Sequence, residues 1–331
     1  MKNTLFIILI FISKLISAQE NKFADNTDFN GYIQIRSVSN FDDFTSFSVR
    51  RLKLWLKSKP EFSKHWSYKI QTTFSSLAQE KFFLQDVKIK YKTGLFSFDI
   101  GQFVPQYSLQ RFQPDYKIET IERANAINIL IPNGTLGVRD IGLQANFKTK
   151  NELFETHLGI FNGYGIKEYR FNNQGYMITH KSSFQIPIKQ NIVKLGYSLQ
   201  YRYAENLQFK FILPDTFLFN GYDFRYNLFA MYETKSVKLQ AEFLQANLEK
   251  NNAFGYYLLS AFNIKKNQIV FSYEKYKDLI KETSDNPYCR IGYNYFIKDY
   301  NIKLSLDNYF QISKNCIENY YASVQLQILL N

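Results

Sequence analysis

Apolar and polar residues alternate with a period of two along most of the chain after residue 28. Within residues 44–58, for example, Leu52, Leu54 and Leu56 share one face, whereas Arg51 and Lys53 lie on the other. Such alternation predicts β-strands with one apolar face, because successive side chains of a strand point to opposite sides. The last strand repeats the pattern most regularly, over residues 317–330.

The alternation predicts about sixteen strands, separated alternately by short turns and by mostly longer loops. Both termini then lie at the short-turn end, as in an up-and-down outer-membrane barrel, whose strand number is even. The expected strands cover roughly residues 29–37, 44–58, 62–75, 82–92, 94–103, 141–148, 152–163, 176–187, 192–203, 221–233, 236–248, 253–264, 267–277, 287–298, 301–311 and 317–330.

An apolar face recurs on nearly every expected strand, and the opposite face is polar and charged throughout. This favours an all-β fold, a closed antiparallel transmembrane β-barrel with lipid outside and water inside, over a soluble sandwich. Closure also removes the unpaired strand edges that lipid cannot satisfy. Tyrosine pairs near strand ends are typical of an interfacial girdle: Tyr201 and Tyr203, Tyr256 and Tyr257, Tyr293 and Tyr295, and Tyr320 and Tyr321.

One connection is far longer than the usual two to six residues or so. It covers about 104–137, and its isoleucines, among them Ile118, Ile121 and Ile127, favour a packed loop. As the third long loop of the barrel, it is expected to fold inward and narrow the pore. It is the constriction loop of the predicted architecture.

The start of the chain has the pattern of a secretory signal peptide over residues 1–18, with Lys2 before an apolar run and Ala18 at the cleavage site. A short polar leader, 19–28, would connect it to the barrel, 29–331. The chain has 331 residues and a net charge of +12, and no later apolar run is long enough for a transmembrane helix. The mean hydropathy of −0.31 does not exclude a membrane barrel, since polar lumen positions lower the average.

Five short segments resemble the phosphate-selective porin O and P family: Ser48–Lys57, Gly101–Gln110, Ile121–Arg123, Arg139–Gly142 and Phe161–Gly163. Their order and spacing cover roughly residues 30–165, and the second half is similar only in its strand pattern. The resemblance implies a sixteen-stranded, usually trimeric outer-membrane porin for small hydrophilic solutes, located in the bacterial outer membrane. The cleavage site is similar to those of Bacteroidetes secreted proteins.

Gln110 departs from that family, which has Glu at this position. The chain ends in Leu329, Leu330 and Asn331 and lacks the terminal aromatic residue typical of barrel assembly signals.

Side-chain parity predicts more bases than acids in the lumen, which favours anions because a low-dielectric wall focuses the field. The expected bases are Arg36, Arg51, Lys53, Lys57, Lys69, Lys88, Lys90, Lys181, Lys194, Arg202, Arg225, Lys238, Arg290 and Lys303. The expected acids are Asp86, Asp99, Glu155, Asp223, Glu233, Glu242, Glu274 and Asp307. Small anions such as phosphate are therefore the expected solutes, with lipid as the other partner.

The residues expected nearest the narrowest point, the eyelet, are Arg51, Lys53, Arg111, Arg123 and Arg139, and Arg36, Lys57, Lys69 and Lys88 are expected to line the pore nearby. Glu122 and Asp140 are expected to pin the loop to the wall. From Val104 to Asp140 the bases and acids balance, so general anion diffusion is favoured over a dedicated phosphate filter.

The sequence disfavours several other functions. His65, His157 and His180 are dispersed, without metal-ligand spacing, and no catalytic or nucleotide motif occurs, so neither an enzyme nor a cofactor is expected. His157 and His180 have lumen parity, which counts against a lipid-face hydrolase. Nucleic-acid binding is disfavoured because the bases are dispersed. The alternative that stays open is a non-conducting barrel acting as an adhesin or scaffold through its outer loops.

Overall fold

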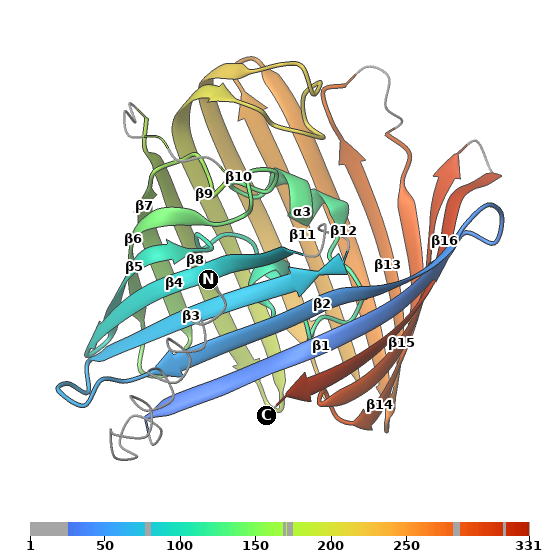
Figure 1. The fold of residues 1–331 in the computed structure, drawn as a ribbon, viewed down its shortest axis with the longest axis horizontal. Helices are drawn as coiled ribbons and strands as arrows, with labels where there is room; N and C mark the ends of the chain where they lie inside the picture. Colours follow the sequence, from blue (N-terminus) through green and yellow to red (C-terminus); the bar gives the residue numbers. More distant parts are fainter. Residues whose placement is uncertain are drawn as a thin grey trace, which may run out of the picture.

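In a computed structural model that describes residues 26–76, 81–167, 170, 175–280, 285–313 and 316–330, sixteen antiparallel strands close into one barrel (Figure 1). Each strand pairs with its neighbours in the sequence, and β1 pairs with β16 to complete the closure. The predicted fold class, a closed antiparallel barrel of about sixteen strands, is confirmed. The predicted signal peptide, 1–18, and most of the leader, 19–25, lie outside the described residues.

The strand bounds follow the predicted alternation closely. The strands are β1 (Thr27–Ser39), β2 (Thr45–Ser58), β3 (Trp66–Ser75), β4 (Lys81–Thr93), β5 (Phe96–Phe103), β6 (Asp140–Lys148), β7 (Phe154–Phe161), β8 (Met177–Ile188), β9 (Asn191–Leu207), β10 (Phe219–Glu233), β11 (Val237–Leu248), β12 (Asn251–Ile264), β13 (Asn267–Lys277), β14 (Tyr288–Lys298), β15 (Ile302–Ser313) and β16 (Cys316–Leu330).

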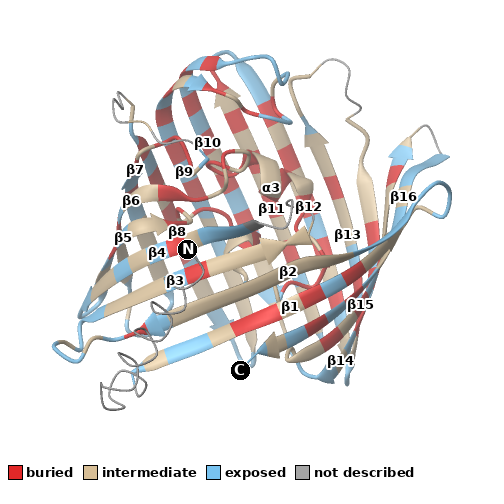
Figure 2. Ribbon diagram, in the orientation of Figure 1, coloured by how far each residue is buried: buried red, intermediate tan, exposed pale blue. Residues whose placement is uncertain are grey.

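Burial alternates along the strands, and Figure 2 shows the resulting bands on β8 to β12. In β10, Asp223 and Arg225 are fully buried, whereas Tyr222, Phe224 and Leu228 are exposed. An aqueous surface would not favour so many exposed apolar side chains on every strand. The apolar outer face therefore suits a lipid environment, and the polar side chains point inward.

The two ends of the barrel differ in their connections. At the end where β1 begins and β16 ends, residues 94–95 join β4 to β5 and residues 189–190 join β8 to β9. Gly94 has a positive φ of 56° in the first of these tight turns, a conformation that glycine adopts without a steric cost. The opposite end carries longer connections, including residues 104–139, 162–176 and 208–218.

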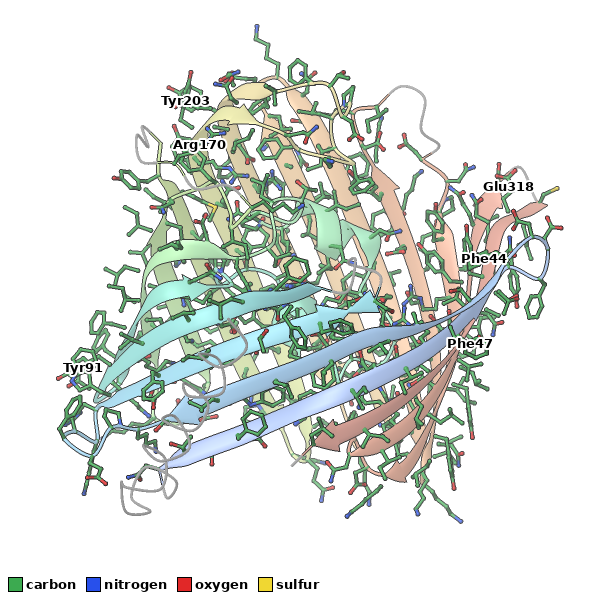
Figure 3. The ribbon with its side chains drawn as sticks, viewed as in Figure 1. Phe44, Phe47, Tyr91, Arg170, Tyr203 and Glu318 are labelled. Carbon is green, nitrogen blue, oxygen red and sulfur yellow. The ribbon has the colours of Figure 1, made fainter. Side chains whose placement is uncertain are left out.

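Aromatic side chains lie near both ends of the barrel, and Figure 3 marks Tyr91 and Tyr203 at opposite ends. Of the predicted girdle residues, Tyr201, Tyr203, Tyr293 and Tyr295 are exposed on the outer face. Tyr257 is a correction, because it is buried and its hydroxyl donates to Glu242. Adjacent residues of a strand face opposite ways, so Tyr256 and Tyr257 could not share one face.

The β5–β6 connection, residues 104–139, contains the short helices η2 (Gln110–Phe112) and α3 (Asn125–Leu130). Figure 1 shows α3 and its neighbouring segments within the barrel outline. Within the described parts of the chain, no helix is long and apolar enough to cross a membrane.

Candidate functional site

The constriction loop, residues 104–139, bonds to strands on opposite sides of the barrel and therefore lies in its interior. Its hydrogen-bonded pairs with the wall include Asp115 with Tyr32 of β1, Ser108 with Ser198 of β9, Asn125 with Glu274 of β13, Ile118 with Lys303 of β15 and Tyr116 with Gln327 of β16. A segment outside the barrel could not reach inward-pointing side chains around its whole circumference.

One part of the inner wall is apolar and packs against the loop. Ala126, Ile127 and Leu130 of α3 are fully buried in this contact. The wall residues in the same cluster include Leu244, Ala246 and Leu248 of β11, Ala253, Tyr257, Leu259 and Ala261 of β12, and Val270 of β13. The prediction that the inner face is polar and charged throughout is thus wrong for these three strands, because here the loop replaces water.

The backbones of loop and wall come close in this contact. A Cβ atom added to Gly255 of β12 would lie 2.7 Å from the Cβ of Ala126, which is closer than two such carbons approach. Asn125 N–H, in the first turn of α3, donates to Glu274 Oε2 at 2.7 Å. Glycine on the wall and a carboxylate beside the first turn together position the helix.

Glu122 joins the loop to the first two strands. Its Oε1 accepts from Arg36 Nη1 of β1 at 2.7 Å and from Arg50 Nε of β2 at 2.5 Å. Burial raises the pKa of Glu122, but the arginines Arg50, Arg36 and Arg51 lower it further, so the net pKa lies below its ordinary value. These contacts place Glu122, the residue expected to pin the loop, between the loop and the first two strands.

Asp115 lies at the eyelet and contacts several bases. It accepts from Tyr32 Oη at 2.9 Å and from Lys53 Nζ at 2.5 Å, and it pairs with Arg123 of the loop. Arg51 Nη1 lies 3.6 Å away. Burial raises the pKa of Asp115, but Arg123, Arg51 and Lys53 lower it well below its usual range, so the carboxylate stays ionised.

The far end of the loop is held at Arg139 and Asp140. Arg139 Nε donates to Asp86 Oδ1 of β4 at 2.7 Å. Asp140 Oδ2 accepts from Asn133 Nδ2 at 2.8 Å and from Gly163 N–H at 2.9 Å. Asp140 thus connects the loop to the β7–β8 connection rather than to a wall base.

A cavity of about 300 Å³ remains between the loop and strands β1 to β6. Among the described residues, seven bases and three acids line it. The bases are Lys53, Lys57, Lys69, Lys88, Arg111, Arg123 and Arg139, and the acids are Asp86, Asp99 and Asp115. The structure thus brings four of the five expected eyelet bases to one cavity, and Arg51 reaches its Asp115. Lys57, Lys69 and Lys88 also line it, whereas Arg36 binds Glu122 instead.

The sequence from Val104 to Asp140 carries equal numbers of bases and acids, whereas the cavity lining has an excess of bases. The difference arises because the acids of the loop pair with bases of the wall and of the loop itself. Glu119, for example, pairs with Lys238 of β11 at 2.7 Å. Two lining bases, Lys57 and Arg111, make no ion pair with any described residue. They are the cations most available to a solute.

A second cavity of about 580 Å³ adjoins the first at the end of the barrel where β1 begins. The two cavities share Lys57, Lys69 and Lys88, and Lys59 and Lys90 also line the second. A row of lysines thus extends from this mouth of the barrel to the constriction.

Sequence parity missed Arg50. A β-bulge between β1 and β2 pairs Gln34 with Arg51 and Ile35 with Val49, so Arg50 has no partner in the register. The bulge lets both Arg50 and Arg51 reach the loop, and single-sequence alternation cannot locate such an extra residue. Trp55 lies on the lumen face of β2 beside Lys53 and Lys57, and a prediction based on charge alone assigns no role to it.

His180 is a correction, since it faces the outer surface. Its ring packs against exposed Tyr197, and its Nε2 lies 3.1 Å from Thr156 Oγ1 and 3.2 Å from Ser182 Oγ. No described carboxylate bonds to the His180 ring. No described cluster of His, Cys, Asp or Glu could hold a metal ion either.

Comparisons with known proteins agree with this geometry. A model of the family phosphate-selective porin O and P matches residues 23–307. No curated protein matches the chain. Among solved structures, OmpF of Salmonella typhi in complex with daunomycin is similar over 92% of this chain and 98% of its own, with a TM-score of 0.65 and 12% identity.

The in-vitro folded trimer form of OmpT, an outer membrane protein of Vibrio cholerae, gives a TM-score of 0.61 at 10% identity, covering 92% of this chain and 99% of that one. A mutant Rh. blastica porin gives a TM-score of 0.57 at 9% identity, covering 92% of this chain and 100% of that one. At such identities the likeness concerns the fold.

Proposed function

The chain belongs to the phosphate-selective porin O and P family, and we propose that this outer-membrane porin prefers anions as its diffusing solutes. The observation that carries the proposal is the cavity between the constriction loop and strands β1 to β6, whose described lining holds seven bases and three acids. An excess of one sign in a narrow, low-dielectric passage raises the local concentration of the opposite ion.

Lys57 and Arg111, which make no ion pair with any described residue, can bind a passing anion transiently. Arg111 projects from the loop and Lys57 from β2, and both line the cavity. A guanidinium offers several donors to phosphate or carboxylate oxygens, and an ammonium adds a mobile charge. Conduction requires that such sites bind weakly enough to release the ion again.

Paired charges favour general anion diffusion over a dedicated phosphate filter. Lys53 and Arg123 are held by Asp115, and Arg139 is held by Asp86. These cations are already partly neutralised, so they offer fewer free donors to a phosphate group than a dedicated filter would. We therefore expect phosphate to pass as one of several small anions.

We also expect a homotrimer in the bacterial outer membrane, reached by means of the signal peptide predicted over residues 1–18. The similar OmpT structure is of the trimer form, and the apolar outer face of this barrel suits lipid. Chemical cross-linking of detergent-extracted protein measures the subunit number.

The test is the reversal potential of the refolded protein in a planar bilayer under a KCl gradient. A potential of anion-selective sign supports the proposal, and a cation-selective sign overturns it. A correctly folded barrel without any conductance would instead favour the adhesin or scaffold function through the outer loops. Added phosphate that blocks chloride current at low concentration would contradict the expectation of general diffusion.

A further inference from the structure

We propose that the constriction cavity favours anions with a flat apolar face, such as aromatic carboxylates, over compact anions such as acetate or phosphate. The proposal rests on the anion preference argued above and names the solute class of the same cavity. Aromatic rings line the cavity together with its bases, and the charge-based prediction did not use them.

Trp55 of β2 and Tyr116 of the loop both line the cavity. Their ring centroids lie 6.5 Å apart, and their planes differ by only 9°. Parallel rings in full face contact would be separated by about 3.5–4.0 Å, the optimal distance between carbon atoms. The faces of the two rings therefore do not cover one another, and both residues are only half-buried.

Tyr32 of β1 supports both rings. Its centroid lies 6.2 Å from that of Trp55 at an interplanar angle of 61°, and 5.7 Å from that of Tyr116 at 54°. Tyr32 is buried, and its hydroxyl is held by Asp115 at 2.9 Å. The three rings therefore form a fixed aromatic wall, and ordering them on binding costs little conformational entropy.

Bases surround this aromatic wall at the distances that a small aryl anion spans. Lys57 follows Trp55 by two positions on the same face of β2, which places the two side chains about 7 Å apart along the strand. Lys57 is exposed and has no ion-pair partner among the described residues. A ring lying on Trp55 could thus place its carboxylate at the ammonium of Lys57.

The loop side offers a similar combination. Arg111 lines the cavity from η2, and Lys117 Nζ, just outside the lining, lies 5.8 Å from the ring centroid of Tyr116. A compact anion contacts these cations but gains nothing from the rings. An aryl anion gains an offset or edge contact with aromatic carbon, which corresponds to about a two- to tenfold increase in affinity.

The experiment compares benzoate with acetate in planar bilayers holding the full-length refolded channel. Each anion is added as its potassium salt to a fixed KCl background, and the block of chloride current is titrated. We expect benzoate to block at about two- to tenfold lower concentration than acetate, although it is the larger ion. Equal block by the two, or weaker block by benzoate, overturns the proposal.

The chain has two tryptophans, which supply a matched pair of variants. Trp55→Leu keeps an apolar side chain but removes the ring, and it should lower the benzoate affinity toward that of acetate. Trp66→Leu changes an exposed tryptophan that packs on Tyr91 at the end of the barrel, and it should leave the block unchanged. Unchanged benzoate block in Trp55→Leu overturns the role of the ring.

A second variant keeps the proposal testable if Trp55→Leu fails to fold. Trp55→Phe keeps an aromatic face, and it should retain most of the difference between benzoate and acetate; loss of that difference in a folded Trp55→Phe channel counts against stacking. The sign of the reversal potential in KCl alone separates the two proposals. An anion-selective channel without benzoate preference rejects only this inference, whereas a cation-selective channel rejects the proposed function itself.

Discussion

Arg36 and Glu122 join the first strand of the barrel to the constriction loop, with 2.7 Å between Arg36 Nη1 and Glu122 Oε1. Arg36 Nε and Nη2 also donate to Gln325 of β16, the last strand. The guanidinium thus connects the loop to the seam at which the barrel closes. Arg50 reaches the same carboxylate oxygen from β2.

Removing the charge of Glu122 should loosen the loop. Glu122→Gln keeps the size of the side chain but leaves two arginines without their carboxylate, at a cost of about 1–3 kcal/mol in loop docking. We expect larger fluctuations of the open-channel current, because the loop edge at the eyelet becomes mobile while α3 stays packed. Single-channel recording measures this noise directly.

Glu318→Gln is the matched control, since Glu318 is exposed on β16 (Figure 3). It should leave the current as quiet as in the wild type. Equal noise in Glu122→Gln and wild type would contradict the pinning role of Glu122.

The contacts that Glu122 and Asp115 make between the loop and the wall should persist as the pH falls through the ordinary range of carboxyl groups. The pKa of Glu122 is lowered by Arg50 and Arg36 despite its burial, and the pKa of Asp115 is lowered by Arg123 and Arg51. A lowered folded-state pKa contributes stability above the unfolded value, about 4.3 for Glu, that is lost only as the pH falls through the folded value. Conductance and noise should therefore stay constant from about pH 7 to about pH 4.

The measurement is a pH series of single-channel recordings at constant KCl. A transition in noise or conductance with a midpoint near pH 4, the ordinary range of Asp and Glu, would show that these carboxylates titrate normally. Glu122→Gln provides the comparison, because its loop already lacks this carboxylate at every pH.

The strands could be predicted from sequence because a half-buried strand has a strict period of two. The apolar Leu52 and the charged Lys53, for example, indicate by their chemistry alone that they face opposite sides of the strand. The barrel and most of its inward-pointing charges could therefore be predicted. The prediction was wrong where a bulge interrupted the period of two, or where the loop and not water covers the inner face. The bulge beside Arg50 adds a residue to one strand, and nothing in the local sequence marks its position.

The interior of the barrel was harder to predict because two distant segments determine it together. Leu244 and Ala253 are apolar yet face inward, since α3 covers them. The charge of the eyelet likewise depends on which loop acids turn toward the wall, and the pairing of Glu119 with Lys238 is not visible in a sum over residues 104–140. Contacts across more than a hundred residues leave no periodic signal in one sequence.

Arg111 should contribute more to selectivity than a base outside the constriction. Arg111→Gln removes a cation that has no ion-pair partner among the described residues, and a charge of this kind acts on a passing anion with about 0.5–1 kcal/mol in a hydrated passage. We expect the anion-to-cation permeability ratio to fall about two- to fivefold. Reversal potentials under a KCl gradient give the ratio.

Lys235→Gln changes a lysine in the turn between β10 and β11 and should alter the permeability ratio little. If the two variants lowered the ratio equally, the whole field of the barrel rather than the eyelet would set selectivity.

The apolar contact under α3 should hold the loop independently of its ion pairs. Leu130 is fully buried, and its carbonyl accepts from Arg225 Nη1 at 3.1 Å. Leu130→Ala should cost about 2–5 kcal/mol through lost burial and the cavity left behind. This cost falls on loop docking, because the barrel keeps its closed ladder of strand pairs.

We therefore expect Leu130→Ala to make the constriction loop sensitive to added protease while the folded barrel keeps its heat-modifiable mobility on gels. Leu158→Ala removes the same atoms from an exposed, outward-facing position on β7 and should change neither property. Loss of loop protection and of barrel mobility together would mean that the loop is part of the barrel's stability. In that case strands β11 to β13 fold into the wall only when the loop covers their apolar inner surface.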